Sequence, residues 1–408
     1  MATSRKDPKG RKLRDGESYR SDGRYQYRYS LGNGKRHVIY ATTLEKLREK
    51  EEEVRDNQRN NIKTNVSRVT LNDMFELYMS GKTELKPSTR TNYIYMYNNY
   101  IKDELGSRKI TSIKYSDIKR FYNSLINDKG FKPNSMEIVN TIIHPVFTLA
   151  VRDGYIRINP TDGAMAEIKK SHNWEKPKRH ALTVDEQQAF IEFVSNSKTY
   201  KHWLPLFTVF LGTGCRVGEI IGLRWSDCDF EKGIISINHN LIYRQSDDGK
   251  CSFHVTTPKT SAGVRTVPML NDVRKALIQE KKKQIAEGFN QTEIDGYSGF
   301  IFTNRVGYIH NPQTINRAIK RIIRDYNKEE KEIAKIEKRK PLEIRDFSVH
   351  SLRHTFCTRF CENETNLKVI QEIMGHSDIT TTMNIYAEAT NDKKQEAFSQ
   401  LEGKIKIC

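Results

Sequence analysis

Long apolar segments are missing from this chain of 408 residues. It contains no run of about 18 consecutive apolar residues, the length that a membrane-spanning helix requires. The N-terminus begins with charged residues and lacks the apolar core of a signal peptide. The sequence therefore predicts a soluble, cytoplasmic protein with no membrane partner.

Cysteine is scarce as well, with six residues scattered at positions 215, 228, 251, 357, 361 and 408. This pattern is typical of reduced thiols rather than of a disulfide framework. Cys357 and Cys361 stand one helical turn apart and could share a metal, but no second Cys or His pair has matching spacing. A glycine-rich phosphate loop and a convincing acidic metal cluster are also absent from the sequence.

Positive charge is abundant. Lysine and arginine number 69 against 51 acidic residues, which leaves a formal net charge of +18. Such a surface attracts polyanions, with nucleic acid the commonest partner and acidic membrane the next. We expect a nucleic-acid-binding protein.

The first 65 residues predict a small β module. Residues 1–16 are basic and polar, which is typical of a flexible arm. Beyond them Tyr25, Tyr27 and Tyr29 alternate with polar residues between two turn sequences, 22–23 and 32–34, which predicts a three-stranded antiparallel sheet. We expect the tyrosines on the packed face and arginines on the exposed face.

A helix follows the predicted sheet, running from Leu44 to about Gln58, and Thr42 with Glu45 has the spacing of a capping box at its start. A sheet covered by one helix leaves its other face to solvent or to a ligand. Because β-sheets can enter the major groove of DNA, residues 1–65 are a candidate DNA-binding module.

Residues 66–165 predict a helical bundle. A polar linker around 61–67 precedes it, and a basic linker around 162–180 follows it. Between about residues 69 and 159 the apolar residues recur at helical spacing. They are Leu71, Phe75, Leu77, Tyr78, Tyr93, Tyr97, Ile101, Ile118, Phe121, Tyr122, Leu125, Ile138, Ile142, Ile143 and Phe147. Basic residues in the connections, such as Lys86 and Arg90, could contact backbone phosphates, although each one alone is more often solvated.

Residues 175–408 predict a mixed α+β domain. Thr183 and Asp185 can cap a helix through Val194, and 203–211 is apolar enough for a buried helix. Short strands are expected near 234–238, 241–244, 253–256 and 265–268, with helices from Asp272 onward and an exposed helix or loop over 328–340. The fold class is therefore multidomain and mainly α.

Arg216 follows the predicted buried helix and a Gly-Thr-Gly break. A guanidinium at the end of a core helix is desolvated enough to bind a phosphate as a two-armed fork. An internal ion pair with a residue such as Glu219 is an equally good interpretation of Arg216 alone.

A second basic group opens a predicted helix that has Leu352, Phe356 and Phe360 on its apolar face. His350, Arg353 and His354 lie within its first turns, where the helix N-terminus already favours an anion. The alternative is a solvated basic helix start.

Three further residues carry potential chemistry. His376 follows a helix over 367–374 that Gly375 plausibly ends, and Ser377 or Asp378 can cap the short helix bearing Tyr386. Lys259 lies in a turn between two predicted strands. Each residue alone is more often structural or solvated. Together with Arg216, His350 and Arg353, these residues predict a cationic phosphate site that is followed by a tyrosine nucleophile.

Arg216, Lys259, His350, Arg353, His376 and Tyr386, in this order, resemble the active-site set of the tyrosine recombinases of the lambda-integrase type. The three-part layout is similar to integrases of conjugative transposons and temperate phages. The resemblance covers essentially the whole chain. It implies a site-specific recombinase that integrates and excises a mobile element and needs no cofactor.

The resemblance also implies a role for each residue. Tyr386 would attack a DNA phosphodiester and form a 3′-phosphotyrosine, while Arg216 and Arg353 stabilise the charge on the phosphate. Lys259 would protonate the departing 5′-oxygen. His350 would assist proton transfer at the tyrosine, and His376 would hydrogen-bond the phosphate.

The implied assembly has four protomers on two DNA duplexes. The sheet would bind arm-type sites, and the other two domains would clamp the core site. The apolar stripe Ala397, Phe398, Leu401 and Ile405 suits a tail that packs on a neighbour or on its own domain. An excisionase or DNA-bending protein could assist, and the location would be the bacterial nucleoid. A type IB topoisomerase and a non-catalytic DNA-binding regulator are the alternatives.

Overall fold

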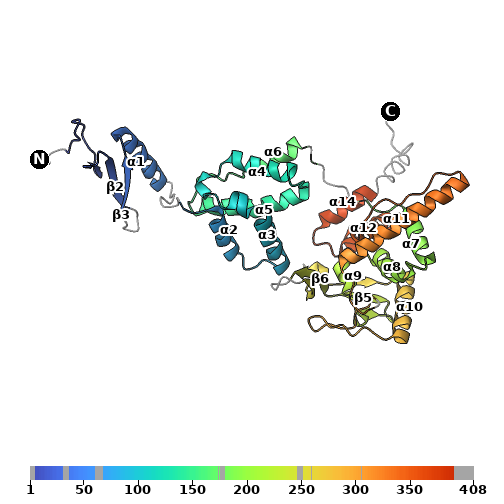
Figure 1. The fold of residues 1–408 in the computed structure, drawn as a ribbon. Helices are drawn as coiled ribbons and strands as arrows, with labels where there is room; N and C mark the ends of the chain where they lie inside the picture. The colour runs from blue at the N-terminus through green and yellow to red at the C-terminus, as the bar shows by residue number, and fades with distance from the viewer. Residues whose placement is uncertain are drawn as a thin grey trace, which may run out of the picture. The chain divides into compact units, whose positions relative to one another are not determined.

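The computed structural model describes residues 5–30, 36–59, 68–172, 174, 180–245, 251–258, 260–304 and 306–389. The chain divides into two compact units, Met1–Lys176 and Pro177–Cys408. Both are mainly helical with small antiparallel sheets, as predicted (Figure 1). This division does not separate the first two predicted domains, so the three boundaries stay a prediction.

The N-terminal sheet has the predicted three antiparallel strands, β1 (Glu17–Tyr19), β2 (Tyr25–Ser30) and β3 (Arg36–Ala41), in the order β1-β2-β3. The helix α1 (Leu44–Arg59) packs against β2 and β3. Tyr25 and Tyr27 lie in the core with Leu44 and Leu47, whereas Arg28 is exposed. The tyrosine face is therefore the packed face, as expected.

Two local predictions for this module are wrong. Residues 5–16 are not a loose arm, because the buried Asp7 carboxylate accepts hydrogen bonds from the Tyr25 hydroxyl at 2.8 Å and the Arg11 Nε at 2.9 Å. Leu13 also packs in the core. The residue that caps α1 is Thr43 rather than Thr42, since its hydroxyl accepts from the Lys46 amide at 3.2 Å. The helix begins at Leu44 because that side chain fills the core beneath the sheet.

The helices after the first module form their own core, as predicted. They are α2 (Leu71–Ser80), α3 (Pro87–Tyr100), α4 (Tyr115–Asn127), α5 (Pro133–Arg152) and α6 (Ala164–Ser171). The helix α6 occupies part of the predicted linker, and its buried Ala164 and Ile168 explain why it folds onto the bundle. Leu77 is exposed, contrary to expectation, and Met74 and Met79 take core positions on α2 instead.

The second unit combines helices with two small sheets. Its first helices are α7 (Val184–Asn196), capped by Thr183 as predicted, α8 (Leu204–Thr213) and α9 (Val217–Ile221). Strands β4 (Cys228–Asp229), β5 (Ile234–Ile237) and β8 (Arg265–Pro268) form one sheet in the order β4-β5-β8. Strands β6 (Asn240–Gln245) and β7 (Cys251–Thr256) form a separate hairpin.

The remaining helices are α10 (Asn271–Glu287), α11 (Pro312–Glu337), α12 (Val349–Asn363), α13 (Leu367–Met374) and α14 (Ile379–Ala389). The prediction of helices from Asp272 to the end misses the non-helical residues 288–304 and 306–311, which separate α10 from α11. The 328–340 segment is largely the end of α11. It is mostly exposed, as expected, with Glu330 and Ala334 as its buried residues. Glu330 pairs with Arg339.

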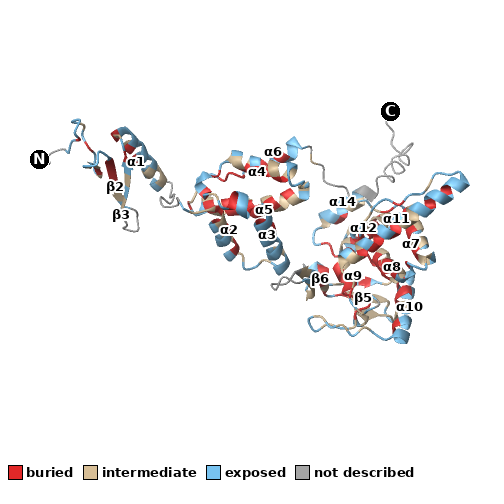
Figure 2. Ribbon diagram, in the orientation of Figure 1, coloured by how far each residue is buried: buried red, intermediate tan, exposed pale blue. Residues whose placement is uncertain are grey.

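Helix α12 contributes residues to two hydrophobic clusters, and Figure 2 colours its buried residues red. Val349 and Leu352 face the large core built from α7, α8, α11 and the β4-β5-β8 sheet. Cys357 and Cys361, on another face, join Ile370 and Met374 of α13 in a smaller cluster. The helices α13 and α14 both contact α12. This smaller cluster fixes the C-terminal helices against the domain.

In the described part of the chain, no helix combines the length and the apolar character needed to cross a membrane.

Leu47 is fully buried in the small core of the N-terminal module. We expect Leu47→Ala to destabilise this module by about 3 kcal/mol, since truncation of a buried leucine leaves a cavity. Hydrogen exchange of the β2 and β3 amides in the full chain measures the effect. The exposed neighbour Lys46→Ala is the control, and equal protection in both variants would contradict this packing.

Candidate active site

Arg216 is positioned by the turn that ends α8. Gly214 adopts a left-handed φ of 61°, and a Cβ there would lie 2.3 Å from the Phe356 ring, so only glycine fits. Arg216 then caps α9, and its backbone N–H donates to the Glu219 carboxylate at 2.8 Å. Its Nη1 pairs with the same carboxylate at 2.9 Å, which is the internal ion pair considered from the sequence. The side chain is still 41% exposed, so a ligand can reach it.

Arg353 projects from α12 into the interior and is only 5% exposed. Its Nη1 donates to the Gly214 carbonyl at 2.8 Å and its Nη2 donates to the Met374 carbonyl at 2.7 Å. Burial, together with the nearby charge of Arg216, lowers the pKa of Arg353 to about 10. The guanidinium therefore stays charged at neutral pH in a site that favours an added anion.

The C-terminus of α13 is where the arginines meet. Gly375 is left-handed at φ 62°, and the His376 and Gly375 amides close back on the Gln371 and Glu372 carbonyls at 3.1 Å each. The next three carbonyls each accept one guanidinium N–H: Ile373 from Arg265 Nε at 2.7 Å, Met374 from Arg353 Nη2 at 2.7 Å, and Gly375 from Arg216 Nη2 at 2.7 Å. We call Arg216, Arg265 and Arg353 the arginine clamp.

Glu219 is the acidic partner of this clamp and is 3% exposed. Arg265 Nη2 pairs with Glu219 at 2.9 Å, on the opposite carboxylate oxygen from Arg216. Burial alone would raise the pKa of Glu219, but Arg265 and Arg216 hold it below its ordinary value. Three guanidinium groups and one carboxylate leave a net positive site, which suits the binding of a phosphate.

His376 follows the clamped carbonyls directly and is buried. Its Nδ1 lies 2.9 Å from the Thr382 hydroxyl. Burial, with the charges of Arg353 and Arg216, lowers the pKa of His376 to about 4, so the imidazole is neutral at pH 7. When Thr382 donates to Nδ1, the proton resides on Nε2, and His376 can donate a hydrogen bond to an oxygen.

His350 lies in the first turn of α12 and is exposed. Its charge is among the causes that lower the pKa of His376, so the two imidazoles share one electrostatic environment. His354, one turn further along, has its Nδ1 3.4 Å from the Thr358 hydroxyl of the same helix. The helix start thus carries two histidines, of which His350 interacts electrostatically with His376.

Tyr386 belongs to α14, which begins after Asp378 accepts the Thr380 amide at 2.9 Å. Asp378, rather than Ser377, is thus the residue that caps this helix. The Tyr386 ring is half-buried and packs at the edge of the cluster formed by α12 and α13. The helix that carries the tyrosine therefore rests on the helices that carry Arg353 and the clamped carbonyls.

Two predicted features lie outside the described residues. These are Lys259 and the tail with Ala397, Phe398, Leu401 and Ile405. The structure in turn brings in Arg265 and Thr382, which sequence reasoning missed. A signal for Arg265 was present, because it alternates in phase with the buried Val267 on β8. Thr382 carries no comparable signal.

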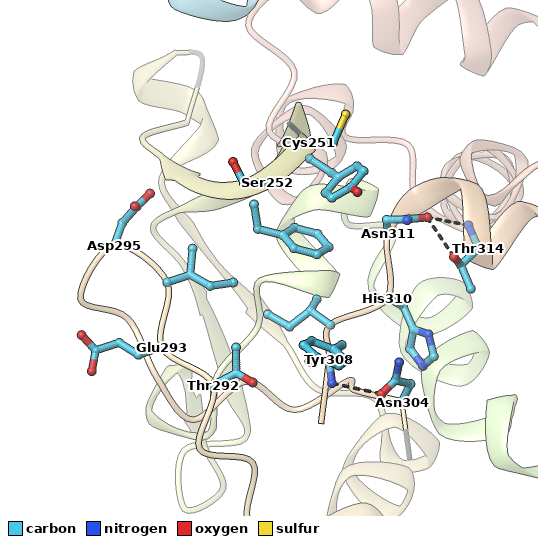
Figure 3. A pocket seen from close by; sticks show the side chains of 14 residues that line it. Cys251, Ser252, Thr292, Glu293, Asp295, Asn304, Tyr308, His310, Asn311 and Thr314 are labelled. Carbon is cyan, nitrogen blue, oxygen red and sulfur yellow. Dashed lines mark hydrogen bonds between the residues drawn. The ribbon is translucent and has the colours of Figure 1, made fainter. Parts of the chain in front are cut away.

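A cavity of about 660 Å³ lies away from the candidate residues, between the β6-β7 hairpin and the 292–311 region (Figure 3). Tyr243, Ser252, Asp295 and His310 are among the residues that line it. None of the candidate residues that the structure describes belongs to this lining. The described residues also include no group of three His, Cys, Asp or Glu able to hold a metal ion.

Three family models match consecutive parts of the chain. The phage integrase family matches residues 180–393, the DNA-binding domain of tn916 integrase matches 1–58, and the phage integrase N-terminal SAM-like domain matches 70–126. The transposase from transposon Tn1545 of Streptococcus agalactiae is 30% identical over 416 aligned residues, covering 98% of this chain and 97% of the relative. The transposase from transposon Tn916 of Enterococcus faecalis has the same identity and coverage.

Solved structures give a consistent comparison. The Tn1549 transposon integrase in complex with a circular intermediate DNA is 29% identical, with a TM-score of 0.70 over 82% of this chain and 99% of that chain. A lambda integrase dimer bound to a COC′ core site has a TM-score of 0.53 at 18% identity, over 92% of this chain and 95% of that chain. The second likeness shows the fold alone.

The left-handed Gly375 can be tested by substitution with alanine. A Cβ there would lie 2.9 Å from both the Ala262 carbonyl oxygen and Arg265 Nη1. Gly233→Ala is the matched control, since Gly233 has a φ of 66° but nothing within 4 Å. We expect the control to lose about 1–2 kcal/mol from left-handed strain alone. Gly375→Ala should lose clearly more in urea unfolding, and equal losses would contradict the close packing.

The low pKa of His376 predicts a pH dependence of stability. The unfolded imidazole binds a proton near pH 6.5, whereas the folded one does so only at about 4. The free energy of unfolding should therefore fall as pH drops between these values, by up to about 3 kcal/mol for this group.

Urea unfolding at several pH values across that interval measures the slope of the unfolding free energy against pH. His376→Gln should make this slope shallower. His310, whose pKa is also lowered to about 4, chiefly by burial, contributes in the same direction. His310→Gln should therefore reduce the slope separately. An unchanged slope in His376→Gln would mean that this imidazole is not held neutral.

Proposed function

This chain belongs to the phage integrase family and is a site-specific recombinase of the tyrosine type, and we propose that Tyr386 is its nucleophile and the arginine clamp its phosphate site. The observation that carries the proposal is the convergence of Arg216, Arg353 and His376 at the end of α13. Helix α14, which bears the tyrosine, packs on that same helix.

In the proposed reaction, the Tyr386 oxygen attacks a phosphodiester of DNA and forms a bond to phosphorus. The bond from phosphorus to the 5′-oxygen breaks, which leaves a 3′-phosphotyrosine and a free 5′-hydroxyl. Because the new linkage keeps the energy of the broken one, the 5′-hydroxyl of a partner strand can reverse the step and join the strands. This sequence balances without any added cofactor.

The cationic residues stabilise the negative charge that develops on the non-bridging oxygens of the phosphate. Arg216 and Arg353 retain N–H donors beyond those bound to carbonyls, and donors held in place before the reaction cost no reorganisation. His376, neutral and oriented by Thr382, would donate to a non-bridging oxygen. His350 would take the tyrosine proton, and Lys259 would protonate the leaving 5′-oxygen.

The three proposed domains divide the binding of DNA. Residues 1–65 would bind arm-type sites, 66–165 would contact the core site, and 175–408 would catalyse strand exchange. The match of 1–58 to the DNA-binding domain of tn916 integrase supports the first assignment. The Tn1549 relative in complex with a circular intermediate DNA supports integration and excision of a mobile element as the biological role.

The working assembly we propose is a homotetramer on two DNA duplexes, because recombination needs four cleaved strands. The tail with Phe398, Leu401 and Ile405 would pack on a neighbouring protomer, and an excisionase or DNA-bending protein would assist. The substrate and the bacterial relatives favour action at the nucleoid in the cytoplasm.

The proposal is tested with nicked DNA that carries the candidate crossover site. The wild-type chain should form a protein-DNA adduct that survives denaturant, and Tyr386→Phe should form none because the nucleophilic oxygen is gone. Tyr326→Phe, another half-buried tyrosine of the same unit, is the matched control and should form adduct normally. An adduct in Tyr386→Phe would contradict the assignment. Relaxation of supercoils without a recombinant product would indicate a topoisomerase instead.

Arg216→Ala separates catalysis from binding in the same assay. Loss of a charge-stabilising donor should reduce cleavage by about 10²-fold or more, whereas many other contacts to the duplex keep its affinity. Gel-shift titration measures binding, and adduct formation measures cleavage. Parallel loss of both would count against the proposed role of Arg216.

A further inference from the structure

Arg265 is a largely buried member of the clamp, and its guanidinium is engaged with protein groups. Its side chain is 6% exposed, at the start of β8. Its guanidinium donates to the Ile373 carbonyl at 2.7 Å, the Gly263 carbonyl at 3.2 Å, both oxygens of Glu219 at 3.2 and 2.9 Å, and the Cys215 sulfur at 3.6 Å. Because these contacts occupy the N–H donors of Arg265, its guanidinium has none left to bind a DNA phosphate directly.

The contacts with Glu219 decide what Arg265 can do. Glu219 is buried and faces two guanidinium groups, with Arg216 on one oxygen and Arg265 on both. A buried carboxylate that lost one cation would draw more strongly on the other, because an uncompensated buried charge is costly. Without Arg265, Glu219 would therefore pull Arg216 into a two-armed pair and occupy the donors that a phosphate needs.

Arg265 also fixes the position of the helix end to which Arg216 binds. It holds the Ile373 carbonyl, and a Cβ on Gly375 would lie 2.9 Å from its Nη1. The Gly375 carbonyl is the second anchor of Arg216, at 2.7 Å. Both anchors of the Arg216 guanidinium, Glu219 and Gly375, are thus in contact with or packed closely on Arg265.

We propose that Arg265 is a positioning residue for strand cleavage, which neutralises Glu219 and holds Gly375 so that Arg216 keeps donors available for the scissile phosphate. The inference rests on the proposed function. It assigns a role in the reaction to a group that does not touch DNA, and it predicts that this role operates through Arg216.

A double-mutant cycle tests the route. Adduct formation on the nicked substrate is timed for the wild type, Arg265→Met, Arg216→Lys and the double variant. Arg265→Met should reduce the rate of adduct formation by about 10²-fold, which is the effect expected when a catalytic group is misplaced by about 1 Å. In the Arg216→Lys background, Arg265→Met should reduce the rate of adduct formation by at most about a further 3-fold. The effects of two residues that act as one unit are not additive.

Two further variants separate positioning from stability. Arg345→Met removes a more exposed cation, the one that pairs with the buried Glu186 at 2.8 Å elsewhere in the unit, and should cleave at the wild-type rate. Arg265→Lys keeps a cation beside Glu219 and should recover part of the lost rate. If Arg265→Met does not fold, Arg265→Lys replaces it in the cycle, with the same requirement that its loss shrinks in the Arg216→Lys background.

The outcomes are distinct for the inference and for the proposed function. Two results would overturn the role of Arg265 alone, provided that the wild-type chain cleaves. One is that the losses of cleavage rate in the two single variants multiply in the double variant. The other is that neither Arg265→Met nor Arg265→Lys loses any cleavage rate. A wild-type chain that binds the substrate but never forms an adduct would overturn the proposed function itself.

Discussion

The candidate site depends on one interaction, the capture of the C-terminal carbonyls of α13 by three guanidinium groups. A helix C-terminus carries unpaired carbonyls and partial negative charge, which normally face water or a nearby cation. Here Ile373, Met374 and Gly375 each bind an arginine from a different element. Those elements are β8, α12 and the start of α9, which are distant in sequence. Each carbonyl accepts a hydrogen bond from one N–H donor of its guanidinium, and this contact fixes the direction of the remaining donors.

This arrangement connects folding with chemistry. The helix end offsets some of the repulsion between three like charges, and Glu219 offsets more. Burial, together with the charge of Arg216, still lowers the pKa of Arg353, so an added anion is favoured. A bound phosphate would supply negative charge at this site. Burial and the same positive field lower the pKa of His376, so that the neutral imidazole can donate a hydrogen bond without adding a fourth cation. The proposed phosphate site would thus be preorganised before DNA arrives.

Much of this organisation was predictable from residue patterns, and the exceptions have physical causes. The sheet and most helices follow from the alternation and helical spacing of apolar residues, and Gly375 follows from its place after a helix. The cap at Thr43, the folded segment 5–16 and the helix α6 depend on tertiary contacts that local spacing does not encode. Arg265 was missed because an arginine in a short strand is usually solvated, and its carbonyl partner lies 108 residues away. The order of motifs indicated the site, but not what positions it.

A structure of the chain bound to nicked DNA carrying the crossover site tests the central claim most directly. It should place the non-bridging oxygens of the scissile phosphate within hydrogen-bond distance of Arg216 and Arg353, with the Tyr386 oxygen of the same or an adjoining protomer facing phosphorus. A phosphate bound elsewhere, with the three carbonyls of α13 still holding the clamp, would contradict the account.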